Sequence, residues 1–281
     1  MRWKGREQSS NVEDRRGLSG KQVVAGGAVG TIIIALIVWI LGGNPLQVLN
    51  NMGTSGSFTT EETTITADDD LTQFVSVVLK DTEDVWNTLF SQSGKTYREP
   101  KLVLYSQATQ SACGYSSAAT GPFYCPGDEK VYIDLDFLEQ LQQQLGAPGD
   151  FAIAYIISHE IGHHVQKLLG ITDQMESLRS QMSKEQYNQY SVRLELQADF
   201  LAGVWAYHAQ KMKDILEEGD IEEALNAASA VGDDRIMMEQ QGYVVPDAFT
   251  HGTSEQRVRW FTKGFRTGDP NQGDTFNAQN L

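Results

Sequence analysis

The stretch Ser158-His159-Glu160-Ile161-Gly162-His163-His164-Val165 decides how the rest of the chain is interpreted, because it contains the pattern His-Glu-x-x-His. Positions four apart lie on the same face of an α-helix, so His159 and His163 can direct their imidazoles to one point. Two neutral imidazoles at that spacing are typical zinc ligands. Glu160 can take a proton from a water molecule held at the same point. The stretch therefore predicts the chemistry of a zinc hydrolase, most simply a peptidase.

The residues before this motif predict that it lies on a buried helix. Gly149-Asp150 can begin a helix with Asp150 as its N-cap, and the residues from Phe151 to about Leu169 are almost wholly apolar up to the motif. A helix that is apolar on all sides is buried in a globular protein. Polar groups on such a helix need partners, and a bound metal would supply one.

A third ligand is expected from a second helical stretch, which runs from about Lys184 to Lys213. A catalytic zinc usually has three protein ligands and an open position for water, whereas a structural zinc is usually closed by four. This stretch contains Arg193-Leu194-Glu195-Leu196-Gln197-Ala198-Asp199, in which Glu195 is the best candidate for the third ligand. Asp199 lies one turn further along the same face, where it can accept the spare ring N–H of a liganding histidine. The sequence offers only three good ligands, which favours catalysis over a structural role.

Composition and charge exclude one broad class of function. Of the 281 residues, 40% are hydrophobic and 21% are charged, which is the balance of an ordinary globular protein. The formal net charge of −15 argues against a protein that binds nucleic acid. The charge is unevenly spread, because residues 1–21 carry six basic and three acidic side chains and the remainder therefore carries −18.

An uncharged segment, residues 22–43, separates this basic stub from the acidic body. The segment is strongly apolar and has about the 20 residues that a helix needs to cross a bilayer. The sequence therefore predicts a single-pass membrane anchor, with the N-terminus in the cytoplasm and the acidic body in the periplasm or outside the cell. A cleaved signal peptide is the alternative, but the apolar region is long and Gly42-Gly43-Asn44-Pro45 is a poor cleavage site. Gly26 and Gly30 give a weak signal for helix-mediated self-association.

Composition divides the rest of the chain into a linker, a domain and a tail. Residues 44–70 are rich in Gly, Ser, Thr and Asn and are expected to form a flexible linker. We assign residues 71–268 to a single metal-binding domain and residues 269–281 to a C-terminal tail. The domain is predicted to be α+β, mainly helical with a small sheet. Helices are expected at 70–91, 135–145, 151–169 and 184–213 and from Thr253 or Ser254 onward, and strands at 101–106, 123–124 and 130–134.

Cys113 and Cys125 are the only cysteines in the chain. On the outer side of a membrane an even number of cysteines suggests a disulfide, so we expect these two to be paired. The alternative is that they bind a metal, but their spacing matches no common zinc pattern.

Taken together, these motifs resemble those of the gluzincin metallopeptidases, a group that includes thermolysin. The resemblance implies that His159, His163 and Glu195 bind one Zn²⁺, that Glu160 is the general base and that Asp199 supports His159. The chain is more closely similar to the predicted neutral zinc metallopeptidase family of bacteria. The matching segments are Gly121-Pro122-Phe123-Tyr124-Cys125-Pro126, Val131-Tyr132-Ile133-Asp134, His159-Glu160-Ile161-Gly162-His163-His164-Val165-Gln166 and Glu195-Leu196-Gln197-Ala198-Asp199.

This resemblance extends over nearly the whole chain, because the basic N-terminus, the apolar segment and the Ser/Thr-rich linker are also similar to that family. It implies a zincin-like fold, a location at the bacterial inner or cell membrane, and a peptide or protein as the substrate. In membrane-associated gluzincins a histidine and an arginine follow the glutamate-bearing helix at a spacing similar to that of His251 and Arg257. The resemblance implies that His251 stabilises an oxyanion and that Arg257 braces the site or binds a carboxylate. Plain helix capping also explains this segment.

Two other functions remain open on the sequence alone. The domain could be a zinc-stabilised binding or scaffolding module at the cell envelope that catalyses nothing, since structural zinc contributes folding energy directly. It could also be a zinc amidase that acts on a non-protein amide of the envelope. The residues that hold the metal are the same in all three cases.

Overall fold

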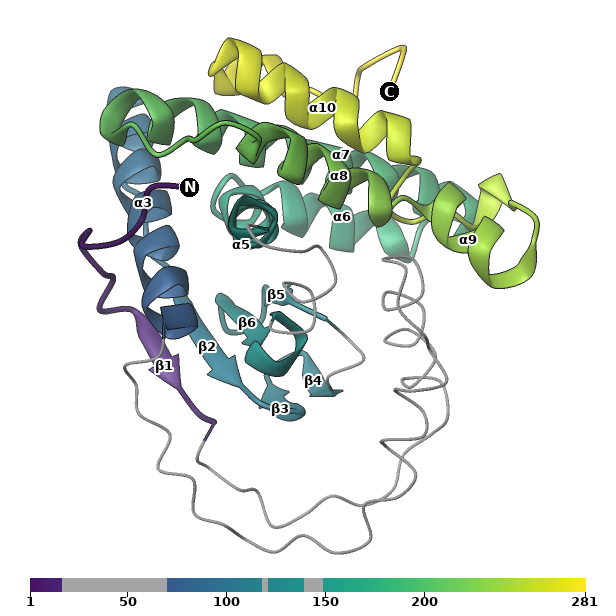
Figure 1. Ribbon diagram of the computed structural model, residues 1–281. Coiled ribbons are helices and arrows are strands. Elements are labelled where there is room, and N and C mark those ends of the chain that lie inside the picture. Colours follow the sequence, from purple (N-terminus) through teal and green to yellow (C-terminus); the bar gives the residue numbers. More distant parts are fainter. Residues whose placement is uncertain (17–69, 118–120, 139–148) are drawn as a thin grey trace, which may run out of the picture.

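The computed structural model describes residues 1–16, 70–117, 121–138 and 149–281 (Figure 1). The predicted anchor at 22–43, with its Gly26 and Gly30 pair, lies outside the described residues, and so does the predicted linker apart from Asp70. Across the four described ranges, no helix is both long enough and apolar enough to cross a membrane.

The described part of the chain is mainly helical with one small sheet, as the sequence predicts, and it also contains a separate hairpin that was not predicted. The helices expected from the patterning lie within two residues of their predicted bounds, except that the one expected at 135–145 can be followed only at residues 135–138. The helices are α3 (Asp70–Gln92), α5 (Asp150–Leu168), α6 (Ile171–Arg179), α7 (Lys184–Lys213), α8 (Asp220–Ala230), α9 (Asp233–Gln241) and α10 (Ser254–Thr267), with 3-10 turns η2 (Pro246–Ala248) and η3 (Pro270–Gln272).

The sheet has the strand order β1-β2-β6-β5. Its strands are β1 (Val12–Asp14), β2 (Lys101–Tyr105), β6 (Lys130–Asp134) and β5 (Phe123–Cys125). The first three run parallel to one another, and β5 pairs antiparallel with β6. The chain between β2 and β5 forms a separate hairpin, β3 (Ala108–Ser111) with β4 (Gly114–Ser117). The expected disulfide is present, since Cys113 is bonded to Cys125 and ties the hairpin turn to β5.

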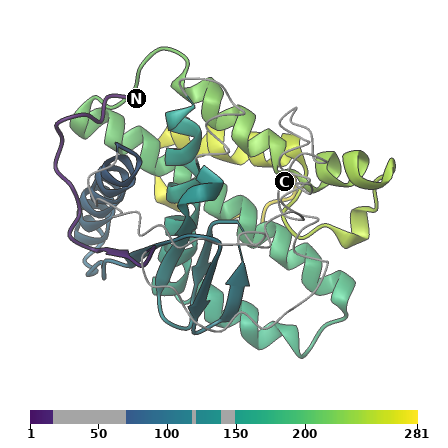
Figure 2. The same ribbon diagram turned by 60° about the horizontal axis from the view of Figure 1, so that its bottom comes forward.

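Residues 1–16 are not a stub apart from the domain, as their composition suggests, but a part of its fold. They run along the outside of α3 to the sheet, where β1 pairs with β2 through the register Val12 to Leu102 (Figure 2). The Met1 side chain is buried, and its ammonium group contacts Asp150 at 2.7 Å. Composition does not reveal this, because it cannot show that Arg2, Lys4 and Arg6 pair with carboxylates far along the chain.

Helix α5 is the central element, since it packs against α7, α8 and α3 and also against the sheet (Figure 1). The helix is almost fully buried, and Phe151, Ile153 and Ile157 are completely inaccessible to solvent. The sequence predicts this position correctly from the apolar run. The predicted N-cap is wrong, because the cap position is Gly149 and Asp150 is the first helical residue. The Asp150 carboxylate instead accepts a hydrogen bond from the Met1 ammonium group.

Helices α7 and α10 cross in close contact through a glycine on each. A Cβ atom at Gly203 would lie 2.1 Å from the carbonyl oxygen of Phe261, and one at Gly264 would lie 2.0 Å from that of Phe200. No larger residue fits at either position, so the two glycines set the separation of the helices. Nearer the candidate ligand Glu195, Gly252 precedes α10 and lies close to Val192 and Leu196 of α7.

Candidate metal centre

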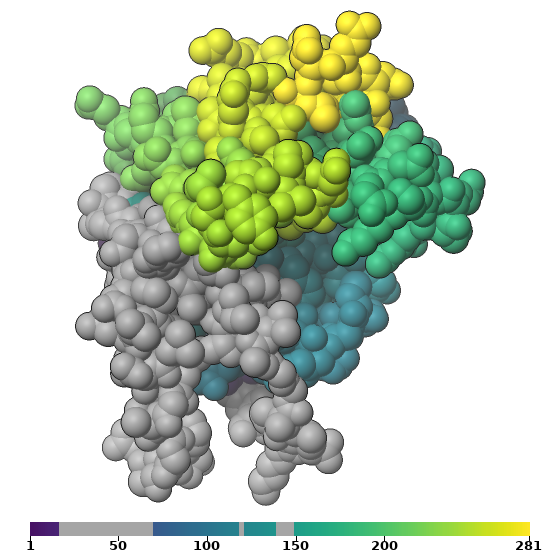
Figure 3. Space-filling model, turned by 90° about the vertical axis from the view of Figure 1, so that its right-hand side faces the viewer, coloured from purple at the N-terminus to yellow at the C-terminus, as the bar shows by residue number. Residues whose placement is uncertain are grey.

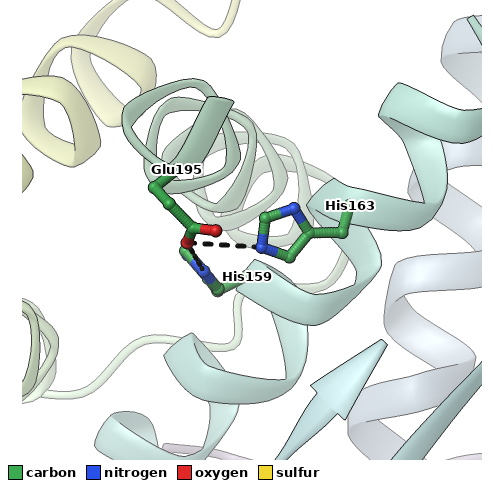
Figure 4. A group of neighbouring side chains, drawn as sticks. All are labelled: His159, His163 and Glu195. Carbon is green, nitrogen blue, oxygen red and sulfur yellow. Dashed lines mark hydrogen bonds and ion pairs between the residues drawn. The ribbon is translucent and has the colours of Figure 1, made fainter. Parts of the chain in front are cut away.

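The three predicted ligands come together from two helices. His159 and His163 lie one turn apart on α5, and Glu195 reaches them from α7 (Figure 4). Helix α5 approaches α7 closely at Gly162, where a Cβ atom would lie 3.0 Å from the carbonyl oxygen of Ala198. The glycine inside the motif therefore brings the two histidines within reach of the carboxylate.

The spacing of the donor atoms fits a zinc ion. One oxygen of Glu195 lies 3.2 Å from Nε2 of His159 and 3.4 Å from Nε2 of His163. Ligands of a tetrahedral zinc at about 2.0–2.1 Å from the metal are about 3.3 Å apart. Two imidazoles and a carboxylate are also a donor set that zinc prefers. Within the residues that the structure describes, no fourth histidine, cysteine or carboxylate joins this group.

The other ring nitrogen of each histidine is already held by a protein oxygen. Nδ1 of His159 donates to Asp199 at 2.9 Å, and Nδ1 of His163 donates to the side-chain oxygen of Gln166 at 2.9 Å. These bonds fix the tautomer that leaves both Nε2 atoms free to bind a metal. Asp199 is where the sequence predicts it. Gln166 was not among the predicted site residues. Its position three residues after His163 on the same helix is nevertheless one from which a side chain can reach that histidine.

The charges of the three predicted ligands and of Asp199 shift the pKa values of these ligands. Burial disfavours the charged form of His159, but the charge and hydrogen bond of Asp199, together with the bond to Glu195, outweigh burial and raise the pKa to about 10. The pKa of Glu195 lies well below its ordinary value, because the neighbouring histidines outweigh its burial. A divalent cation must displace protons from these histidines, so its affinity will fall as the pH falls.

Glu160 stands beside the ligands and binds none of them directly. Its carboxyl group is buried, and burial raises its pKa, while the positive charges of His159 and His163 and a backbone hydrogen bond from Tyr124 act in the opposite direction. A raised pKa is what a group needs to accept and then release a proton near neutral pH. The net effect is a pKa of Glu160 above its ordinary value.

A buried network fixes Asp199, which is completely inaccessible to solvent. Tyr155 donates its hydroxyl to one carboxylate oxygen at 2.5 Å, and Arg257 donates to both oxygens at 2.8 and 2.9 Å. Burial opposes the charge of Asp199, but Arg257 and His159 outweigh burial and lower its pKa to about 2. Arg257 is itself only 4% exposed and also donates to the Tyr155 hydroxyl at 3.1 Å, so its partners here are buried protein groups.

His251 lies near the ligands but does not belong to their group. Its side chain is half exposed, and its Nδ1 atom lies 3.3 Å from Asp233. Burial lowers the pKa of His251, but the bond to Asp233 and the charge of Glu195 outweigh this and raise it. Asp233, which the sequence did not point out, also accepts hydrogen bonds from the backbone N–H groups of Thr250, His251 and Gly252. One buried carboxylate thus fixes the backbone of residues 250–252.

The remaining histidines have structural partners. His164 shares a hydrogen bond with the Tyr124 hydroxyl at 3.0 Å and donates to the carbonyl oxygen of Arg98 at 2.6 Å, so it joins α5 to the chain beside the sheet. His208 donates to the carbonyl oxygen of Gly268. At the start of α10, Thr253 is the N-cap and forms a capping box with Gln256, as the sequence allows.

Figure 3 shows α9 and the residues after it protruding from the surface, with α6 to one side and the sheet region below. A cavity of about 460 Å³ lies between α7, η2 and the start of α10. Its apolar wall includes Phe249 and Val192, and Val192 lies one turn before Glu195 on α7.

The site combines two histidines one turn apart on a buried helix, a glutamate from a crossing helix and an adjacent buried glutamate, an arrangement typical of zinc hydrolases. A protein-family model described as "Putative neutral zinc metallopeptidase" matches residues 1–276. The chain belongs to this family.

The chain is also similar to two curated bacterial proteins. It is 47% identical over 285 residues to the uncharacterized protein YpfJ of Escherichia coli K12, covering 98% of this chain and 99% of that one. It is 45% identical over 195 residues to the uncharacterized protein Rv2575 of Mycobacterium tuberculosis, covering 66% of this chain and 65% of that one. Among solved structures, no significant match is found.

Proposed function

We propose that the protein is a zinc-dependent peptidase that holds one Zn²⁺ with His159, His163 and Glu195 and hydrolyses peptide bonds with Glu160 as the general base. The observation that carries the proposal is the donor geometry: three ligand atoms all lie within 4.8 Å of one another, beside a buried carboxyl group that is not a ligand. Three protein ligands leave a position for a reactant, as catalytic zinc sites do.

Zinc supplies Lewis acidity at this position, lowering the pKa of water there towards about 7 and polarising a carbonyl group. Glu160 takes a proton from the water that attacks the peptide carbonyl carbon and passes it to the leaving amine. His251, which its surroundings favour in the protonated form, donates a hydrogen bond to the carbonyl oxygen as negative charge develops on it.

The network behind the ligands supports this proposal because it holds the groups in one geometry before a substrate arrives. Asp199 orients His159, and Arg257 and Tyr155 orient Asp199. The scaffolding alternative is less well supported, because closed structural zinc sites usually have four protein ligands.

The substitution Glu160→Gln tests the proposal against a digest of an unbiased peptide library. We expect hydrolysis to fall by about 10²-fold to 10⁴-fold, because the group that moves the proton is lost. The zinc content should stay at the wild-type level, because Glu160 is not a ligand. The matched control is Glu176→Gln on the exposed face of α6, which should leave both quantities unchanged.

Two outcomes would count against the proposal. If the wild-type protein with a full complement of zinc cleaves no peptide, the scaffolding role or an amidase acting on a non-protein amide is favoured. If Glu160→Gln cleaves the library as fast as the wild type, the assigned general base is wrong.

A further inference from the structure

Residues 1–16 are bound to the domain along their whole length. The backbone N–H of Arg2 donates to the carbonyl oxygen of Ile215, and that of Ser9 donates to Ser76 on α3. Where β1 begins to pair with β2, the backbone N–H of Leu102 donates to the carbonyl oxygen of Asn11 at 2.9 Å. The Trp3 ring packs edge-on against that of Phe74 with centroids 5.4 Å apart.

The basic side chains of this segment are paired with carboxylates. Arg6 contacts Asp81 on α3 at 2.5 Å, and Asp81 is almost completely buried. Every other arginine or lysine in residues 1–16 also has a carboxylate within 3.5 Å; the pairs are Arg2 with Asp214, Lys4 with Asp70, Arg15 with Glu13 and Arg16 with Asp14. Three of these five partners lie in the domain, at residues 70, 81 and 214.

The acidic and polar side chains of the segment complete the contact. Glu13 is bound by Lys101 at 3.2 Å and by Lys130 at 3.0 Å, from the two neighbouring strands of the sheet. Asn11 donates to both Glu83 and Glu99 at 2.9 Å. Basic groups of the segment thus meet acidic groups of the domain, and acidic groups of the segment meet basic groups of the domain. Such charge complementarity is typical of a specific docking surface.

We infer that the surface formed by α3, β2 and the connection between α7 and α8 is the docking surface for residues 1–16, and that these residues and the metal-binding domain lie on the same side of any membrane. The hydrocarbon layer of a bilayer is about 30 Å thick. Atoms that form hydrogen bonds and ion pairs at 2.5–3.5 Å cannot lie on its two sides.

The ion pairs of residues 1–16 with the domain give the basic N-terminus a different role from the one that its charge suggests. Positive charge before an apolar segment orients a membrane protein when it is free to stay in the cytoplasm. Here Arg2, Lys4 and Arg6 have carboxylate partners in the domain, so these charges serve to dock the segment. The family match begins at residue 1, which is consistent with a segment that belongs to the domain.

Cysteine labelling of the full chain in intact cells tests the inference. Lys4→Cys places a thiol in the docked segment, where the side chain is 75% exposed, and Ser91→Cys places one on the exposed surface of α3. A maleimide that does not cross membranes is added before or after lysis, and the labelled peptide is identified by mass. The wild type is the control for background, because Cys113 and Cys125 are bonded to each other.

We expect the two engineered thiols to behave alike. Both should be labelled to the same fraction in intact cells, or both should be protected until lysis, and either result supports a common compartment. Labelling of one position in intact cells with protection of the other would overturn the inference. Unequal labelled fractions at the two positions would overturn it as well.

Discussion

Asp199 is the residue on which the geometry of the metal centre depends. Its two oxygens accept hydrogen bonds from His159, Tyr155 and Arg257, and no solvent reaches it. Removing one member of a buried ion pair leaves the other charge without compensation, which costs about 3–5 kcal/mol. The carboxylate also sets the orientation of His159. A substitution of Asp199 should therefore lower both the affinity for the metal and the stability of the fold.

We therefore expect Asp199→Asn to lower zinc affinity by about 10-fold to 100-fold, the usual cost of losing a partner behind a ligand. The free energy of unfolding should fall by about 3–5 kcal/mol, because Arg257 stays buried without its carboxylate. Competition with a chelating dye measures the first quantity and urea unfolding measures the second. The control is Asp247→Asn, at an exposed side chain of η2. An unchanged zinc affinity would show that Asp199 does not position His159.

Residue types at fixed spacing were enough to predict the centre, because the helical repeat places positions four apart on one face. His159, His163, Glu195 and Asp199 are brought together by the fold in the arrangement that their spacing indicates. The partners of His251 could not be found in this way. Asp233 is 18 positions away, and its bonds are mostly to backbone N–H groups, which carry no sequence signal.

At the scale of elements, Glu13 joins three strands of the sheet, since its carboxylate on β1 is bound by Lys101 on β2 and Lys130 on β6. Burial raises the pKa of Glu13, but Arg15, Lys130 and Lys101 outweigh burial and lower it from 4.5 to about 2. A carboxyl group whose pKa is lower in the folded state adds stability above its unfolded pKa. That stability is lost as the pH falls from about 4.5 through 2.

Glu13→Gln should therefore destabilise the protein by about 1 kcal/mol at pH 7, a value that allows for the water around this partly exposed group. The difference from the wild type should shrink as the pH falls below 4.5 and vanish near 2. Urea unfolding over a pH series measures it. Glu7→Gln, at an exposed position of the same segment, is the control. A difference that does not depend on pH would mean that the charge of Glu13 adds nothing.

Elements with strong patterning were predicted well, and β1 was missed. Helix α7 and strand β6 lie at their predicted bounds, because long periodic stretches and alternating apolar residues are clear signals. Strand β1 has one apolar residue, Val12, between polar neighbours. Its pairing depends on backbone hydrogen bonds and on ion pairs with residues about 90 to 120 positions away, and no local pattern reports such contacts.

For the molecule as a whole, the described apolar core is built from side chains other than the three predicted ligands. Helices α5 and α7 pack against each other and against neighbouring helices of the domain, and the hydrogen-bond partners of Asp199 are all protein groups. A zinc that holds a fold together behaves differently, because its removal unfolds the domain.

We therefore expect removal of zinc by a chelator to abolish peptide hydrolysis while the far-ultraviolet circular dichroism stays unchanged. The melting temperature should fall, since a ligand that binds only the folded state stabilises it. Zinc added back should restore hydrolysis. Loss of the helical signal on chelation would instead favour a zinc-stabilised scaffold.

The metal content of the purified full chain tests the central claim most directly. Elemental analysis of the wild type should give one zinc per chain, because three donor atoms converge on one point. Glu195→Gln removes the charged ligand but keeps the size of the side chain, and its zinc content after dialysis should be well below that of the wild type. A wild type without zinc after growth in zinc, or a Glu195→Gln variant that retains one zinc per chain, would contradict the assignment of this centre.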